Sequence, residues 1–222
     1  TQNYGLLLAG GPAVVMPFSL LATGSCGGSF ATSLQLQSDS GDLGLAQHEF
    51  YLGSLVATTT ERANATKITI PYSGTRGIAS PFPSAIVVAG VTGTVSKVTV
   101  TLDGFSHAWP GDLDALLVGP TGQAVLLMSD VSEGAGLAVN NLSLTFDDAA
   151  AASLPASTLI TSGSYKPTNY GSGDSFSAPA PGGAHGSALA LFNGLNPNGN
   201  WSLYIQDDSS QDVGSVAQGG HL

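Results

Sequence analysis

The sequence predicts an all-β domain, a jelly-roll β-sandwich with a short strand-rich N-terminal extension. Short segments alternate polar and apolar residues with a period of two, and no long segment has the i, i+3, i+4, i+7 spacing of an amphipathic helix. Only 9% of the residues are charged, against about 25% in typical domains. Thirty glycines and twelve prolines supply turns. Many short strands joined by turns, with no exact internal repeat, favour a jelly roll over a propeller.

Alternating segments come first among the expected elements. Each should be a strand with one face packed and the other in water. They are residues 33–37, 67–70, 97–102, 141–146 and 201–205.

More continuously apolar segments lie at 84–89, 113–118 and 124–128. The last two flank Gly-Pro-Thr-Gly at 119–122, which predicts a hairpin of central strands covered on both faces. A further strand is expected at 187–191.

Two connecting segments are distinctive. Residues 147–152 begin with Asp and continue with Ala, which predicts one helical turn. Residues 153–186 are rich in Ser, Gly, Pro and Ala and are too long for an ordinary loop. We expect them to form a structured excursion over one end of the sandwich. A polar run near 58–64 suggests a soft boundary, and we divide the chain into a strand-rich lead-in, 1–66, and the sandwich, 67–222.

The net charge of the chain limits the classes of partner that it can bind. The net charge of −10 argues against nucleic acid, because phosphate binding needs a basic face, and against docking on an anionic membrane. No segment approaches the roughly 20 apolar residues that span a bilayer. Low lysine content with much Thr, Ser, Gly and Asn is typical of an extracellular protein, secreted or on the cell surface. The single cysteine, Cys26, is interpreted as a buried small residue or an intermolecular thiol.

Catalytic motifs are not found. The four histidines have no metal-ligand spacing, and no nucleophile elbow or phosphate loop occurs. Gly173-Asp174-Ser175 starts like a trypsin-type nucleophile motif, but Phe176 and Ser177 replace the glycines that would follow. His107 is interpreted as a structural histidine at a strand end, with a catalytic base as the alternative. We therefore expect no enzyme activity in this chain.

Aspartates supply the candidate site. Eleven of the fifteen acidic residues lie between Asp103 and Asp212, and hard cations such as Ca²⁺ prefer oxygen ligands from loops. The alternative is turn chemistry, since Asp side chains also bond nearby backbone N–H groups. The candidate calcium ligands are Asp112 and Asp114, placed two apart on one strand face, Asp147 and Asp148, and Asp207, Asp208 and Asp212.

Six short motifs occur in one order between residues 67 and 220. They are His107-Ala-Trp-Pro-Gly-Asp-Leu113, Leu116-Leu-Val-Gly-Pro-Thr-Gly122, Phe146-Asp-Asp-Ala149, Gly163-Ser-Tyr-Lys-Pro167, Leu191-Phe-Asn-Gly194 with Gly199-Asn-Trp-Ser-Leu203, and the turn 207–216. Together they resemble the P domain, or Homo B, the β-sandwich beside the subtilisin-like catalytic domain of proprotein convertases and many bacterial proteases.

This resemblance implies a non-catalytic accessory module that folds, stabilises or modulates a neighbouring peptidase, often with bound calcium. Similar modules also act as interaction domains of bacterial surface proteins without a peptidase. Where the family carries Trp-x-Leu in its last strand, this chain ends at His221 and Leu222, so we expect a truncated closing strand. The alternative function is an adhesion or carbohydrate-binding jelly roll with a glycan partner, for which an exposed Trp109 beside a groove would argue.

Overall fold

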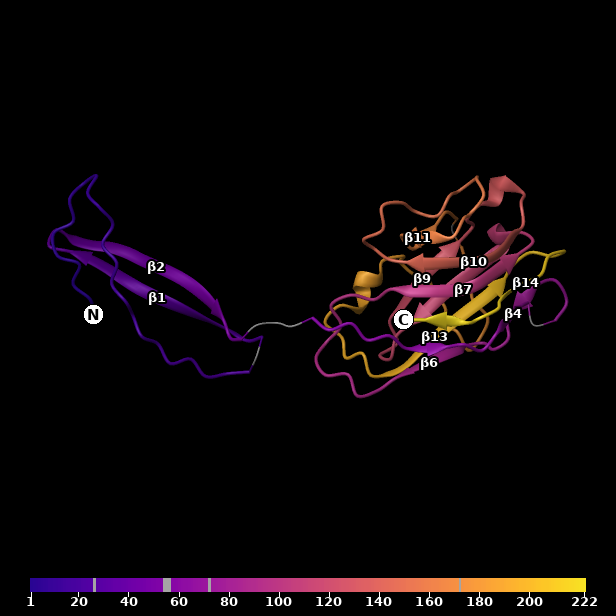
Figure 1. The fold of residues 1–222 in the computed structure, drawn as a ribbon, viewed down its shortest axis with the longest axis horizontal. Coiled ribbons are helices and arrows are strands. Elements are labelled where there is room, and N and C mark those ends of the chain that lie inside the picture. Colours follow the sequence, from indigo (N-terminus) through magenta and orange to yellow (C-terminus); the bar gives the residue numbers. More distant parts are fainter. Residues whose placement is uncertain (26, 54–56, 72, 172) are drawn as a thin grey trace. The chain divides into compact units, whose positions relative to one another are not determined.

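The computed structural model describes residues 1–25, 27–53, 57–71, 73–171 and 173–222, so the interpretation of Cys26 lies outside the described residues (Figure 1). The chain forms two compact units, Thr1–Thr58 and Thr59–Leu222. None of the described helices is long and apolar enough to cross a bilayer.

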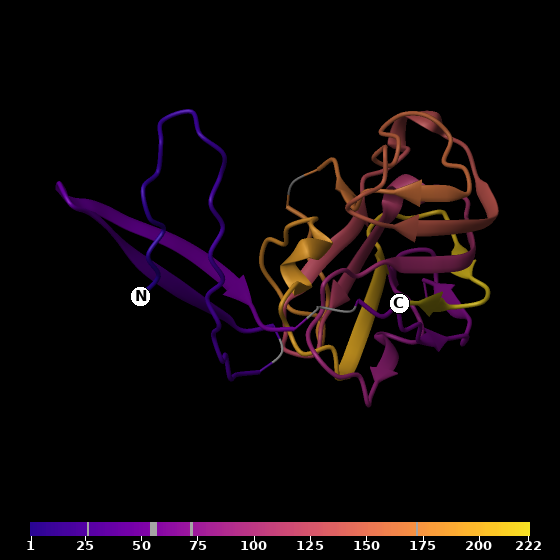
Figure 2. The same cartoon turned by 60° about the vertical axis from the view of Figure 1, so that its left-hand side comes forward.

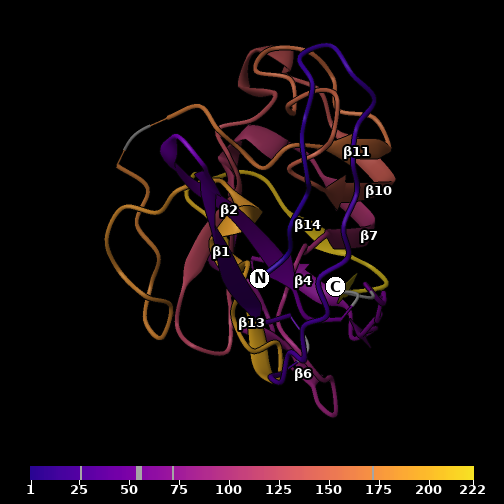
Figure 3. The same ribbon diagram turned by 90° about the vertical axis from the view of Figure 1, so that its left-hand side faces the viewer.

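The first unit contains one long β-hairpin (Figure 3). Strand β1 (Ser29–Ser38) pairs antiparallel with β2 (Gly41–Tyr51). The residues described before β1 form no strand or helix. Most side chains of the hairpin are exposed, and stacking of Phe30 on Phe50, with ring centroids 5.4 Å apart, is its main apolar contact.

The second unit is a sandwich of two sheets, which Figure 2 shows as separate sets of strands. The β7 sheet has the order β10-β7-β14-β4, and the β13 sheet has the order β9-β8-β13-β6. This distribution of eight strands between two sheets is that of a jelly roll, which confirms the predicted fold class. The strands are β4 (Ile68–Ile70), β6 (Ser84–Val88), β7 (Val100–His107), β8 (Leu113–Val118), β9 (Ala124–Ser129), β10 (Val139–Phe146), β13 (Gly199–Asp207) and β14 (Gly214–Val216).

Short elements complete the sheets and their connections. They are β3 (Ala63–Asn64), β5 (Gly77–Ile78), β11 (Gly163–Tyr165), β12 (Thr168–Asn169), β15 (Gly220–His221) and the 3-10 helices η1 (Pro110–Asp112), η2 (Glu133–Ala135) and η3 (Leu189–Phe192). Strand β15 pairs with β3 and with β7. Residues 63–64, which we assigned to the lead-in, therefore contribute a strand to the sandwich.

The core lies between the sheets. Phe105 and Leu144 of the β7 sheet meet Leu117 and Ile205 of the β13 sheet in one buried cluster. Trp201, 3% exposed, belongs to this core.

The outer face of the β13 sheet is covered as well. Leu116, Leu126 and Tyr204 form a second buried cluster there, against Phe82 and Phe176. Because Phe176 belongs to the excursion 153–186, this segment covers the sheet, and β8 and β9 are buried on both faces as predicted.

Two local predictions were wrong. Residues 187–191 form no strand, because Leu189–Phe192 is a 3-10 helix. Residues 147–152 form no helical turn. The backbone there makes a tight turn in which the Asp147 carboxylate accepts a hydrogen bond from the Ala149 N–H, at 2.8 Å.

Candidate functional site

Strand alternation separates the predicted aspartates at one end of the sandwich. Asp114 on β8 lies opposite Gln206 on β13, and Leu113 lies opposite Asp207. Successive side chains of a strand point to opposite faces. Leu113 is in the core cluster between the sheets, so Asp207 faces inward and Asp114 faces the excursion.

An acid-lined cavity of about 380 Å³ lies where Asp114 faces the excursion. We call it the acidic cavity. Gln206 holds the excursion in place here: its side-chain amide donates to the Ser175 carbonyl, at 3.0 Å, and accepts from the Ser177 N–H, at 3.0 Å. The charged residues of its lining are Asp114, Asp130, Glu133, Asp174, Asp208 and Arg76.

Asp114 is the most buried carboxylate of the cavity, with 3% of its surface exposed. Burial, together with the neighbouring charges of Asp174, Asp208 and Asp130, raises its pKa to about 7. The Ser129 hydroxyl lies near enough to Asp114 to lower its pKa against these larger effects, and it donates to Asp130 at 3.2 Å. A hydroxyl has one proton, so it cannot satisfy Asp114 and Asp130 at the same time.

Gly171 makes room for the Asp130 carboxylate. A Cβ at position 171 would overlap Oδ2 of Asp130. Asp130 also has a positive φ of 53°, a conformation that Asp adopts more readily than most residues. The Asp130 carboxylate therefore packs against the excursion at Gly171, where there is no room for a side chain.

A second cavity of about 300 Å³ adjoins the acidic cavity and shares Gly171, Gly173 and Asp174 with it. We call it the apolar cavity, because Leu126, Phe176 and Ala184 line it, and Asn169, Asp174 and His185 add polar groups to its wall. The excursion thus forms walls of both cavities.

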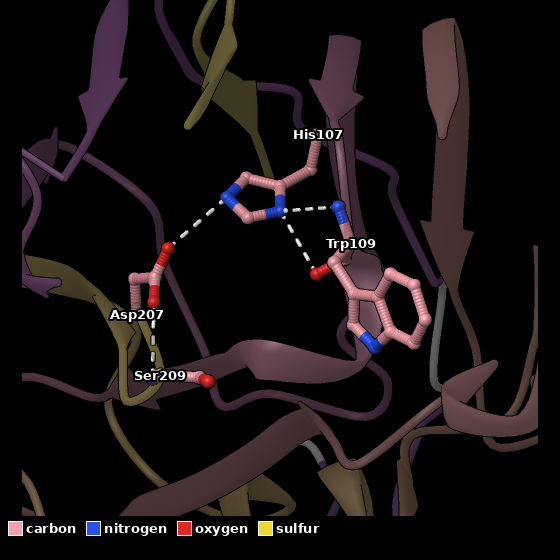
Figure 4. Close-up of polar contacts among 4 residues, drawn as sticks. All are labelled: His107, Trp109, Asp207 and Ser209. Atoms are coloured by element: carbon pink, nitrogen blue, oxygen red, sulfur yellow. Dashed lines mark hydrogen bonds and ion pairs between the residues drawn. The ribbon is translucent and has the colours of Figure 1, made fainter. Parts of the chain in front are cut away.

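Asp207 meets His107 between the sheets (Figure 4). Nε2 of His107 lies 3.2 Å from Oδ2 of Asp207, and both side chains are 0% exposed. The two atoms form no well-aligned hydrogen bond, and their contact is an ion pair only when the His107 ring is protonated. Burial lowers the pKa of the His107 imidazole, and burial raises the pKa of Asp207 to about 6.

The other ring nitrogen of His107 has two backbone neighbours. Nδ1 lies 2.9 Å from the Trp109 carbonyl oxygen and 3.2 Å from the Trp109 nitrogen. A neutral ring can accept from the Trp109 N–H while Nε2–H faces Asp207, and a protonated ring can donate to the carbonyl instead. The backbone contact agrees with a structural histidine at a strand end.

The remaining predicted ligands divide into two groups. Asp112 ends η1 rather than lying on a strand, and burial raises its pKa, with Asp212, Asp208 and Glu133 adding to the rise. Asp208 lines the acidic cavity, and burial raises its pKa too. The five aspartates Asp112, Asp114, Asp207, Asp208 and Asp212 therefore gather at one end of the sandwich.

Asp147 and Asp148 have structural partners instead. Lys97 donates to Asp147 at 2.7 Å, and although burial acts to raise the pKa of Asp147, hydrogen bonds from Lys97 and Ala149 lower it overall. The Asp148 carboxylate accepts from the backbone N–H groups of Leu189 and Ala190, at 2.9 and 2.7 Å. It caps the first turn of η3, forty residues away in sequence.

The carboxylates that the structure describes do not form a compact group of metal ligands. Calcium takes six to eight oxygens at about 2.3–2.6 Å. In the part of the chain that the structure describes, no three His, Cys, Asp or Glu side chains are grouped closely enough to hold a metal ion. The acidic cavity is accordingly lined by separate carboxylates and is larger than the site of a single metal ion.

The residues of the hydrolase and carbohydrate alternatives take other positions. Asp174 and His185 line the apolar cavity, but Nε2 of His185 contacts the Pro181 carbonyl at 3.1 Å, and no described hydrogen bond joins His185 to Ser175. The Trp109 ring is half-buried near Gly136 and is not among the lining residues of either cavity.

Sequence reasoning missed three members of the acidic cavity. Asp130 and Glu133 follow β9, and Asp174 lies in the excursion. Asp130 and Asp174 lie in connecting segments and Glu133 begins η2, and their separation in sequence from Asp114 gives no signal that the four meet. The excursion itself was the one usable clue, because a long segment over one end of a sandwich must bring its side chains to that end.

Family models, characterised proteins and solved structures gave no match to this chain. The resemblance to the P domain is carried by the six sequence motifs.

Proposed function

We propose that this chain is a non-catalytic accessory module of a secreted or surface protein. It resembles the P domain in its motifs, and it would stabilise or modulate a neighbouring peptidase or act as an interaction module. The acidic cavity would be its binding face, and a cation would be what it binds.

The observation that carries the proposal is the burial of Asp114 on an acid-lined cavity. A carboxylate whose pKa is raised makes the folded state less stable whenever it is ionised. Ionised Asp114 therefore costs stability, and Arg76 is the one basic residue among the acids that line the cavity. Such a cost is expected where a ligand of opposite charge supplies the missing interaction.

The buried pair of His107 and Asp207 supports the non-catalytic part of the proposal. A general base must come within hydrogen-bond reach of its substrate. Both side chains are 0% exposed between the sheets, and Trp109 backbone groups contact Nδ1. The pair suits cross-linking of the two sheets.

Thermal unfolding with calcium, with a chelator and with a soluble guanidinium-bearing ligand tests the proposal. Binding at 100 times the dissociation constant stabilises a fold by about 2.7 kcal/mol. We expect at least one of these cations to raise the unfolding midpoint of the natural chain but not that of Asp114→Asn. An unchanged midpoint with every cation would refute a cation-binding role. Calcium is included because the resemblance implies it, and its binding would require the carboxylates at this end to draw together.

A further inference from the structure

We propose that the acidic cavity and the adjoining apolar cavity together bind a basic peptide segment of a partner protein. The acidic cavity would receive an arginine or lysine side chain, and the apolar cavity would receive a neighbouring apolar side chain. This proposal rests on the proposed function and specifies the chemistry of its partner.

The size and spacing of the acidic cavity favour an organic cation over a metal ion. Its volume of about 380 Å³ equals the space of about a dozen water molecules, and it falls within the usual range of ligand pockets. Its carboxylates do not converge in threes on one point. A guanidinium carries five N–H donors across a planar group, so it can reach several separated carboxylates at once.

The lining has the charge and the unfilled acceptors that such a side chain needs. Asp114 lines the cavity with only 3% of its surface exposed, and the Ser129 hydroxyl beside it donates to Asp130. A guanidinium donor that reached Asp114 would supply the hydrogen bond that Ser129 cannot give to both carboxylates. Charge-assisted bonds of this type are the strong ones.

Arg76 shows that a guanidinium is compatible with this surface. It is exposed, it lines the cavity, and its charge lowers the pKa of Asp208, against the larger effect of burial. Arg76 makes no ion pair with any residue that the structure describes. It therefore leaves the inner carboxylates free, and its own charge should oppose the entry of a basic side chain.

The apolar cavity adds a requirement that a free cation does not meet. It is contiguous with the acidic cavity through Gly171, Gly173 and Asp174, and Leu126 and Phe176 offer apolar wall. Two adjoining cavities of different character suit two neighbouring side chains of one chain. A single small cation would use the first cavity alone.

The experiment is a nuclear magnetic resonance titration of the full, isotope-labelled chain. The probes are the capped tetrapeptides Gly-Arg-Leu-Gly and Gly-Leu-Arg-Gly, and matched peptides in which citrulline, a neutral analogue of the same shape, replaces arginine. We expect one arginine peptide to shift amide signals around Asp114, Asp130 and Phe176. Its citrulline counterpart should bind about tenfold more weakly, because it lacks the charge-assisted bonds.

Variants locate the site. Asp114→Asn and Asp174→Asn should each weaken binding of the arginine peptide by about three- to tenfold, whereas Asp147→Asn, whose carboxylate pairs with Lys97, should change it less than about twofold. Arg76→Gln should strengthen binding, since it removes a competing positive charge. Asp174 lies in the excursion rather than on a strand, so its variant keeps the test valid should Asp114→Asn unfold the chain.

Four outcomes would overturn the inference. If the arginine and citrulline peptides bind equally well, the positive charge does not contribute to binding. If Asp114→Asn, Asp174→Asn and the natural chain bind the arginine peptide equally well, the peptide binds elsewhere. If calcium shifts the amides around the acidic cavity but neither peptide does, the peptide site is wrong and the proposed function stands. If neither calcium nor any peptide shifts these amides, both proposals fail.

Discussion

Nε2 of His107 lies 3.2 Å from Oδ2 of Asp207, and this contact joins the last residue of β7 to the last residue of β13. The two strands belong to different sheets. The pair is therefore a buried polar contact between the two sheets, at the end of the sandwich that carries the acidic cavity.

Breaking this pair from one side should be costly. His107→Leu or Asp207→Leu leaves the other buried group without its partner, and we expect each to lower the free energy of unfolding by about 3–5 kcal/mol. The double variant should also lose free energy of unfolding, but at least about 1 kcal/mol less than the sum of the two single losses. Urea unfolding of the four proteins measures this coupling, and strictly additive losses would show that the pair does not interact.

Asp114 should make stability depend on pH. Its pKa is about 7 in the folded chain and near 3.8 when unfolded. The folded state therefore binds the proton more tightly, and stability that is present below about pH 4 is lost as the pH rises through 7. Asp114→Asn removes this effect, so at pH 8 the variant should be more stable than the natural chain by about 1–4 kcal/mol.

Below pH 4 the natural chain and Asp114→Asn should unfold at the same denaturant concentration, since both then carry a neutral side chain. The comparison of the two proteins cancels the contributions of other titrating groups, including His107, whose lowered pKa acts in the opposite direction. If the two proteins differ in free energy of unfolding by the same amount at pH 4 and at pH 8, Asp114 has the pKa of an ordinary aspartate.

Gly214 should tolerate no side chain. A Cβ there would overlap the His107 ring and the Ser106 carbonyl oxygen, so Gly214→Ala must displace the pair of His107 and Asp207. We expect a loss of about 1–3 kcal/mol or more. Gly182→Ala is the matched control, because a Cβ there meets no atom within 4 Å, and its effect should stay within about 0.5 kcal/mol. Thermal and urea unfolding measure both, and similar small effects would argue against close packing at Gly214.

Asp148 should contribute stability through η3. Asp148→Ala removes the acceptor of two backbone N–H groups, and we expect a loss of about 1–2 kcal/mol with fraying of η3. Lys97→Ala is the comparison, since it breaks only the Asp147 ion pair, in which Lys97 is 54% exposed. It should cost less than about 1 kcal/mol. Amide hydrogen exchange at Leu189 and Ala190 reports the cap directly, and unchanged protection would refute it.

Local patterns in the sequence predicted the strands. The alternation at 141–146 and the turn at 119–122 are properties of neighbouring residues, and the structure has β10 and the β8–β9 hairpin in those places. The segment 187–191 was mistaken for a strand because its apolar run fits a strand or a helix. In the structure the Asp148 carboxylate accepts from the Leu189 and Ala190 N–H groups at the start of this 3-10 helix, a contact that neighbouring residues do not reveal.

Composition and alternation by themselves determined an all-β sandwich that contains eleven of the fifteen acids, all between Asp103 and Asp212. Only the tertiary structure decided which acids meet. Asp207 and Asp208 are adjacent in sequence, yet the first lies between the sheets against His107 and the second lines the acidic cavity. Asp114 and Asp174 are sixty residues apart, yet they share that cavity. The physical reason is that side-chain direction follows from strand pairing and from the path of the excursion, and both are set by contacts between distant residues.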